Sequence, residues 1–278
     1  MRPERLDIAA PPLPPDARWV GDPPPPIERL LARGPVLVHF LDFAQLNSVR
    51  SLPYIVAWEE RYREAGLAVL GVHSPRSPLT ADARAMGAAM AHLGVRHPVA
   101  ADLDYAIWHD YGCEGWPSIF LWGRGGALRW FHFGEGAYHE TELAIQAELA
   151  GADESLPAPL APLRPTDARD AIVIAPTPEV FPGGSLREPW HPSEEERALA
   201  LDYEAAGAFA SADGDGGLEV SIDGGPRRAA RIAGPALYEL ASHPHHERHA
   251  MRIEPSPGVR LWSISFAPGV PPPDRVPR

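Results

Sequence analysis

Short apolar runs alternate with amphipathic stretches along the first half of the chain. Residues 36–40 and 67–72 are almost entirely apolar, which is typical of strands covered on both faces. Between them, Ile55, Trp58 and Tyr62 recur at helical spacing, which predicts an amphipathic helix. The charged residues expected to face outward are Glu59, Glu60, Arg61, Arg63 and Glu64. Strands and helices that alternate in this way predict a central sheet covered by helices.

Shorter elements of the same kind continue to about residue 150. A Gly-Arg-Gly-Gly turn joins two apolar segments and predicts a hairpin. The further elements expected are helices at 80–93, 104–111 and 138–149 and strands at 98–101, 118–122 and 128–133.

Beyond residue 170 the pattern changes to short strands separated by glycine-rich turns. The segments 213–217 and 223–226 carry the clearest turn signals. Short strands at this spacing predict an all-β sandwich. The strands expected are 198–203, 206–212, 218–222, 229–232, 237–240, 250–253 and 261–266.

Proline marks the boundaries between these regions. The chain has 34 prolines, which cluster at 11–26, 157–165 and 268–277. We therefore expect five parts. They are a proline-rich leader at 1–26, an α/β domain at 27–150, a Pro/Ala-rich linker at 151–170, the sandwich at 171–270 and a tail at 271–278.

The charge and composition of the chain exclude some classes of binding partner and some kinds of site. The net charge of −12 argues against nucleic-acid binding, which needs a positive face. Cys113 is the one cysteine, so an intramolecular disulfide and a metal site made of several thiolates are excluded. The sequence carries neither a secretory signal pattern nor an apolar run of about 18 residues, so we expect a cytoplasmic protein with no membrane partner.

The apolar strand at 36–40 leads into a helix that contains Pro53, and several downstream motifs accompany it. Together they resemble the thioredoxin-like domain of the exported thiol-disulfide proteins, the DipZ/TlpA-type redoxins. The resemblance implies an α/β thioredoxin fold with a central mixed sheet flanked by helices. The motifs are Gly71-Val72-His73-Ser74-Pro75, Pro98-Val99-Ala100, Asp104-Tyr105-Ala106-Ile107-Trp108, Trp116-Pro117 and Phe133-Gly134-Glu135-Gly136.

The departures from that family gather at its reactive centre. The resemblance aligns the attacking cysteine with Gln45 and the resolving cysteine with Ser48, on either side of Leu46 and Asn47. It also aligns the buried acid of many relatives with His39. Dithiol exchange needs one thiolate to attack and a second to resolve the mixed disulfide, which an amide and a hydroxyl cannot do. We expect a redox-inactive relative without a cofactor.

Pro117 matches the family's cis-proline, which lies against the active-site pair. Such a bond leaves the backbone of Trp116 free to pair with an extended peptide. The leading hypothesis is therefore a peptide- or protein-binding or scaffold protein that uses the segment 45–48 and Trp116–Pro117. The alternative interpretation is a proline that serves the fold alone.

Two enzymatic alternatives remain open. In one, Cys113 alone supports a thiol-dependent oxidoreductase or peroxidase, which requires an exposed thiol with a lowered pKa. In the other, His39 lies next to Ser48 as a base beside a nucleophile, although no oxyanion hole or orienting group can be named. A buried histidine and a structural cysteine are the simpler interpretations.

The second half resembles the jelly-roll domain that follows the redoxin in the same family, a module similar to carbohydrate-binding domains. The matching segments are Thr177-Pro178-Glu179, Leu201-Asp202-Tyr203 and the run from Glu254 to Gly269. Sugar binding would use exposed aromatic side chains, for which Trp190 and Trp262 are candidates. Packing in the core is the other interpretation of both residues.

Two clusters in this half suggest metal ligands. Asp213 and Asp215 resemble the start of a calcium loop, but the later glutamate is absent, so a hairpin turn is expected. The four clustered histidines have side chains that bind zinc or nickel, or they form a solvated connection before the strand at 250. They are His243, His245, His246 and His249.

Overall fold

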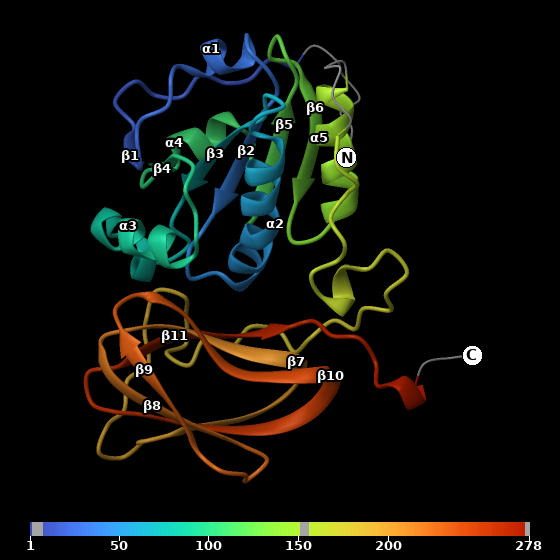
Figure 1. The fold of residues 1–278 in the computed structure, drawn as a ribbon. Coiled ribbons are helices and arrows are strands. Elements are labelled where there is room, and N and C mark those ends of the chain that lie inside the picture. The colour runs from blue at the N-terminus through green and yellow to red at the C-terminus, as the bar shows by residue number, and fades with distance from the viewer. Residues whose placement is uncertain (2–7, 151–155, 276–278) are drawn as a thin grey trace. The chain divides into compact units, whose positions relative to one another are not determined.

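The computed structural model describes residues 1, 8–150 and 156–275. Residues 2–7 of the predicted leader, 151–155 of the predicted linker and 276–278 of the predicted tail lie outside the described residues. The chain folds as two compact units (Figure 1). The first unit comprises Met1–Arg76 and Ala81–Ala161, and the second comprises Ser77–Thr80 and Pro162–Arg278.

A six-stranded mixed sheet forms the centre of the first unit, in the order β1-β4-β3-β2-β5-β6. Strands β2, β3 and β4 are parallel, and β1, β5 and β6 run antiparallel to their neighbours. The α/β thioredoxin fold is therefore confirmed. The strands are β1 (Arg18–Val20), β2 (Val36–Leu41), β3 (Ala68–His73), β4 (Val99–Ala101), β5 (Ser118–Trp122) and β6 (Leu128–Phe133).

Helices cover both faces of this sheet. Alternate residues of β2 point to opposite faces, so Val38 and Phe40 join the core beneath α1 and α4, while Leu37 joins the core beneath α2 and α5 (Figure 1). His39 shares the face of Leu37 and therefore points toward α2. The helices are α1 (Ile27–Leu31), α2 (Leu46–Tyr62), α3 (Ala83–His92), α4 (Ala106–Asp110) and α5 (Tyr138–Leu149). Across the described ranges, none has the length and apolar character needed to cross a bilayer.

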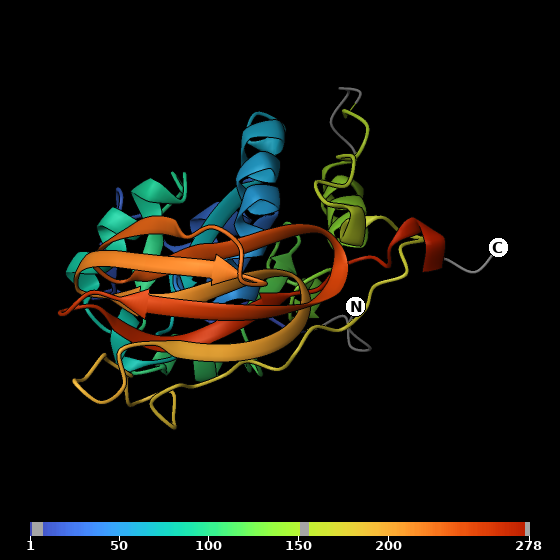
Figure 2. The ribbon, with the colours of Figure 1, turned by 90° about the horizontal axis from the view of Figure 1, so that it is seen from below.

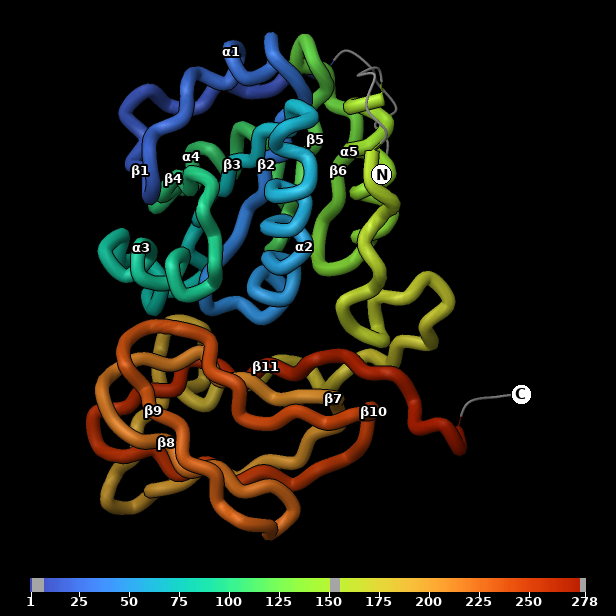
Figure 3. Tube along the Cα trace, viewed as in Figure 1, coloured from blue at the N-terminus to red at the C-terminus, as the bar shows by residue number. Residues whose placement is uncertain are grey.

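The predicted leader is wrong as a separate part, because it contributes a strand to the sheet. Strand β1 pairs antiparallel with β4, with Trp19 opposite Ala100. The tyrosine hydroxyl of Tyr111 donates to the carbonyl of Pro11, so the segment before β1 is also held against the first unit. Figure 3 traces the chain from β1 to α1 and on into the sheet. Three residues between proline clusters are too few for a recognisable strand pattern.

Residues 156–161 of the predicted linker belong to the first unit. Leu156 and Leu160 pack against the core beneath α2 and α5. The Leu160 N–H donates to the buried carboxylate of Glu142 at 2.9 Å. This part of the linker is therefore packed against the domain, because two leucines among its prolines and alanines can reach apolar surface.

A five-stranded antiparallel sheet, in the order β11-β7-β10-β8-β9, builds the second unit. Its long strands bend, so that one sheet supplies both layers of the β-sandwich (Figure 2). The core between the layers contains Ala210, Leu218, Ile253 and Ile264. The strands are β7 (Leu199–Asp213), β8 (Asp215–Ile222), β9 (Arg228–Ala233), β10 (Ala236–Pro255) and β11 (Arg260–Ala267).

The prediction of seven short strands in this unit is wrong in two places. Strand β7 joins the two strands expected at 198–203 and 206–212, and β10 joins those expected at 237–240 and 250–253. The pairing of β10 with β7 shifts register twice, the second time between Ser242 and Glu247. Such irregularities interrupt the period-two pattern without ending the strand.

Candidate functional site

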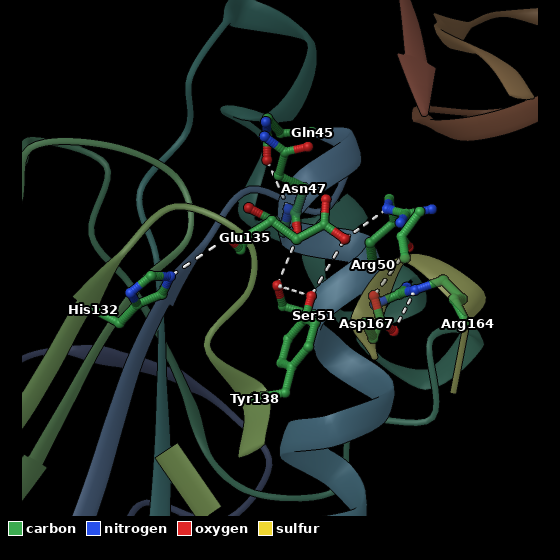
Figure 4. A network of polar contacts seen from close by, with 11 residues as sticks. Gln45, Asn47, Arg50, Ser51, His132, Glu135, Tyr138, Arg164 and Asp167 are labelled. Carbon is green, nitrogen blue, oxygen red and sulfur yellow. Dashed lines mark hydrogen bonds and ion pairs between the residues drawn. The ribbon is translucent and has the colours of Figure 1, made fainter. Parts of the chain in front are cut away.

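Gln45 occupies the N-cap position of α2. Its side-chain Oε1 accepts a hydrogen bond from the Ser48 N–H at 2.7 Å, and its carbonyl accepts one from the Val49 N–H. Figure 4 shows Gln45 at the start of this helix. The residue that the resemblance aligns with the attacking cysteine therefore serves as a helix cap.

Ser48 is buried and its hydroxyl serves the loop before the helix. The Ser48 Oγ accepts a hydrogen bond from the Asp42 N–H at 3.2 Å. In turn, the buried Asp42 carboxylate accepts hydrogen bonds from the Ala44 N–H at 2.8 Å and the Arg76 N–H at 2.7 Å. Leu46, which follows the cap residue Gln45, is also buried. The segment 42–48 is thus held by its own polar groups.

His39 is fully buried and faces another histidine. Its Nε2 lies 2.7 Å from His97 Nε2, and His97 Nδ1 lies 3.1 Å from Glu59 Oε2. Burial lowers the pKa of His39 well below its usual value, and the neighbouring His97 lowers it further. The structure therefore gives His39 and Ser48 different hydrogen-bond partners and does not join them as base and nucleophile. Sequence reasoning missed His97, and its expectation that Glu59 faces outward is wrong, because Glu59 is buried beside His97.

A polar network connects the first turns of α2 with the loop before α5 (Figure 4). The Ser51 hydroxyl donates to the Asn47 carbonyl at 2.9 Å and lies 3.2 Å from the Tyr138 hydroxyl. Glu135 accepts from the Arg50 side chain at 2.6 Å and from the Tyr138 hydroxyl at 3.3 Å. Sequence reasoning noted Glu135 and Tyr138 only as family motifs. The network holds the first turns of α2 against the loop before α5.

Trp116 and Pro117 are joined by a cis peptide bond. The Trp116 indole N–H donates to the Ser74 carbonyl at 2.8 Å, and its ring packs on Trp108 with the centroids 4.2 Å apart. The indole is therefore fixed. In the described part of the chain, the main-chain N–H and C=O of Trp116 have no hydrogen-bond partner.

Cys113 lies half-buried against the core beneath α4. Burial raises the pKa of its thiol well above the usual value, and Asp102 raises it further, while a hydrogen bond with Ser118 lowers it. A reactive cysteine needs the opposite shift, because the thiolate is the nucleophile. The structure therefore lends no support to Cys113 as a catalytic thiol.

Both tryptophans considered for sugar binding are engaged in the fold of the second unit. The buried Trp262 donates its indole N–H to Asp213 at 3.1 Å. Trp190 packs against the core and donates its indole N–H to Glu196. Core packing is the interpretation that fits these contacts.

The hairpin expected at the turn 213–217 is wrong, because β10 lies between β7 and β8 in the sheet. The Asp213 carboxylate accepts two hydrogen bonds from the Arg260 guanidinium, at 2.8 and 2.5 Å. Asp215 forms an ion pair with Arg231. Both carboxylates therefore pair with arginines, and the turn connects two strands that do not pair with each other.

The clustered histidines lie within β10, so the solvated connection expected there is wrong. The ring of His243 stacks on that of His249 at 3.7 Å. His243 Nε2 lies 2.8 Å from the Tyr203 hydroxyl, and His249 Nδ1 lies 2.7 Å from Asp223. His245 and His246 share the strand but not these contacts. Among residues 1, 8–150 and 156–275, no three His, Cys, Asp or Glu side chains are arranged to hold a metal ion.

Comparisons with known proteins identify proteins and structures that are similar to this chain. No model of a known protein family matches the chain. Protein DipZ of Mycobacterium bovis is 27% identical over 89% of this chain. The chain is similar to DipZ over most of its own length. It spans 41% of the length of that relative. The expected resemblance to the DipZ-type redoxins is thereby confirmed.

Further relatives match about half of the chain. The thiol-disulfide oxidoreductase YkuV of Bacillus subtilis is 25% identical over 44% of this chain and 82% of its own length. NHL repeat-containing protein 2 of Gallus gallus is 27% identical over 50% of this chain and 19% of its own. Among solved structures, a thiol-disulfide isomerase from Corynebacterium glutamicum is 24% identical, with a TM-score of 0.46, and covers 51% of this chain and 97% of its own.

Proposed function

We propose that the first unit is a redoxin relative that binds an extended peptide or protein segment and does not exchange dithiols. The observation that carries the proposal is the use of Gln45 and Ser48: the amide caps α2 and the hydroxyl closes the preceding loop. Neither group can be oxidised and reduced in place of a cysteine pair. The half-buried Cys113, whose pKa is raised, offers no substitute.

The open main-chain groups of Trp116 support the binding role. An extended chain pairs through its own N–H and C=O groups, so a segment with one free donor and one free acceptor suits it. The indole of Trp116 is held by Ser74 and Trp108, which fixes the position of the neighbouring main chain. A fixed acceptor and donor lose little conformational freedom on binding.

One experiment with two parts tests this function. A phage-displayed library of random dodecapeptides is selected on the full chain, and a selected peptide is titrated while backbone amide NMR signals are followed. We expect the Trp116 and Gln45 amides to shift and the Asp223 amide in the second unit to remain unchanged. Failure to select any peptide, or shifts confined to the second unit, would contradict the binding role.

The redox part uses insulin reduction by dithiothreitol. We expect the wild-type chain to give the uncatalysed rate, and the double variant Gln45→Cys with Ser48→Cys to exceed it, because the scaffold would then hold two thiols at the start of α2. The matched control is Gln45→Ser with Ser48→Ala, which should stay at the uncatalysed rate. The proposal would be overturned if the wild-type chain and the Cys113→Ser variant both reduced insulin faster than the uncatalysed rate.

A further inference from the structure

A chain of buried ionisable groups runs through the first unit between β2 and α2. His39 on β2 meets His97 through their Nε2 atoms at 2.7 Å, and His97 reaches Glu59 on α2 through Nδ1 at 3.1 Å. The outer end is at Arg63, which pairs with Glu59 at 2.6 Å and is itself half exposed. At the inner end, His39 Nδ1 is buried and has no hydrogen-bond partner in the described part of the chain.

The contact between the two Nε2 atoms limits how many protons the pair can carry. A separation of 2.7 Å is a hydrogen bond, so one nitrogen donates its hydrogen and the other accepts with its lone pair. If both imidazoles were protonated, each Nε2 would carry a hydrogen directed at the other, and two positive charges would meet in the core. The folded pair therefore holds at most one positive charge.

Few other charges face the pair. From α2 come Glu59 and, through it, Arg63. From β3 comes the buried His73, which lies on the same face as Gly71, the neighbour of His39 in the sheet. Arg96 lies beside His97 in sequence, but it is exposed and pairs with Glu60 at the surface. One carboxylate can thus compensate one protonated imidazole, and the contacts shown offer no compensation for a second.

We propose that the His39–His97 bridge is an acid-sensitive lock, which breaks when the second imidazole of the pair is protonated and thereby opens the first unit. Strand β2 leads directly into the loop that presents the start of α2, so loss of the bridge disturbs the segment 42–48 first. The proposed lock rests on the buried histidine pair alone and does not depend on the proposed peptide binding.

The sign of the pH dependence follows from proton counting. In the unfolded chain both histidines titrate near pH 6.5 and take up two protons below it. The folded pair takes up at most one, so the unfolded state binds more protons in acid and stability falls as the pH falls below 6.5. Burial lowers the pKa of His39, which acts in the same direction. The lowered pKa of Glu59 adds a further loss only below the usual glutamate range.

Urea unfolding of the full chain from pH 7 to pH 5 tests the lock, with the amide NMR signals of Val38 for the first unit and Ile253 for the second. We expect the unfolding constant of the first unit to rise on acidification by roughly 20-fold more in the wild type than in His39→Leu, which removes one proton from the balance. The control His92→Gln removes an exposed histidine of the same unit and should match the wild type. Equal pH dependence in the wild type and in His39→Leu would overturn the proposal.

A measurement on the wild type covers the case in which His39→Leu does not fold. Imidazole nitrogen signals of His39 and His97 are recorded in the folded protein down to pH 5. We expect at most one of the two rings to become doubly protonated before the folded signals disappear. Two imidazolium rings in the folded protein would refute the lock.

Discussion

The two segments of the candidate site differ in how their polar groups are satisfied. In the segment 42–48, the Asp42 carboxylate, the Ser48 hydroxyl and the Gln45 amide all bond to main chain nearby. At Trp116, in the described structure, the side chain is bonded while the main-chain N–H and C=O are open. The same fold thus has one segment whose polar side chains bond to nearby main chain, and one whose main-chain groups at Trp116 have no hydrogen-bond partner among the described residues. In our proposal, recognition resides in the second.

Removing the carboxylate of Asp42 should produce the largest effect. Asp42→Ala leaves the buried N–H of Ala44 and the partly buried N–H of Arg76 without this acceptor, so we expect a loss of about 3 kcal/mol in the free energy of unfolding. Urea denaturation measures it. The control Asp104→Ala removes an exposed carboxylate with one long hydrogen bond and should cost less than about 0.5 kcal/mol. Equal costs would mean that the segment 42–48 is not held by Asp42.

The reactivity of the Cys113 thiol, which lies three residues before Trp116, should be low. Because burial raises the pKa of its thiol, we expect the folded chain at pH 8 to react with Ellman's reagent at least about tenfold more slowly than the urea-unfolded chain. Ser118→Ala removes a contact that lowers this pKa and should slow the folded reaction further. A folded rate equal to the unfolded rate would restore Cys113 as a candidate nucleophile.

Loss of the Gln45 cap should have the smallest effect. Gln45→Ala removes the acceptor for the Ser48 N–H, and we expect a loss of about 1 kcal/mol in unfolding free energy. Asn47→Ala, two residues further along the chain, is the matched control and should cost less unfolding free energy. If the two substitutions cost the same, the amide of Gln45 contributes nothing as a cap.

Local patterns predicted the first unit better than the second. The bounds of β5, β6 and α5 match the sequence-based expectation because each is a short element with a regular period and a turn at its end. Strand β10 was divided in two because its register shifts interrupt the alternation. Strand β1 was missed because three residues carry no period.

The candidate site was predictable in position but not in detail. The family resemblance located Gln45, Ser48 and Trp116, but the cap role of Gln45 was not predictable, because glutamine is not among the residues preferred at an N-cap. The meeting of His39 with His97 was not predictable, since 58 residues separate them and no local signal reports a contact across a parallel sheet. Likewise, Arg260 meets Asp213 only because β11 lies beside β7.

Strand β1 has a consequence for how the chain must be handled. It covers the outer edge of β4, whose residues Val99 and Ala100 are fully buried. Removal of β1 from an expressed fragment would leave that apolar strand with unpaired N–H and C=O groups, a template on which other chains can add. A shortened fragment that begins at α1 is therefore expected to precipitate, whereas one that retains Arg18–Val20 should remain dispersed in solution.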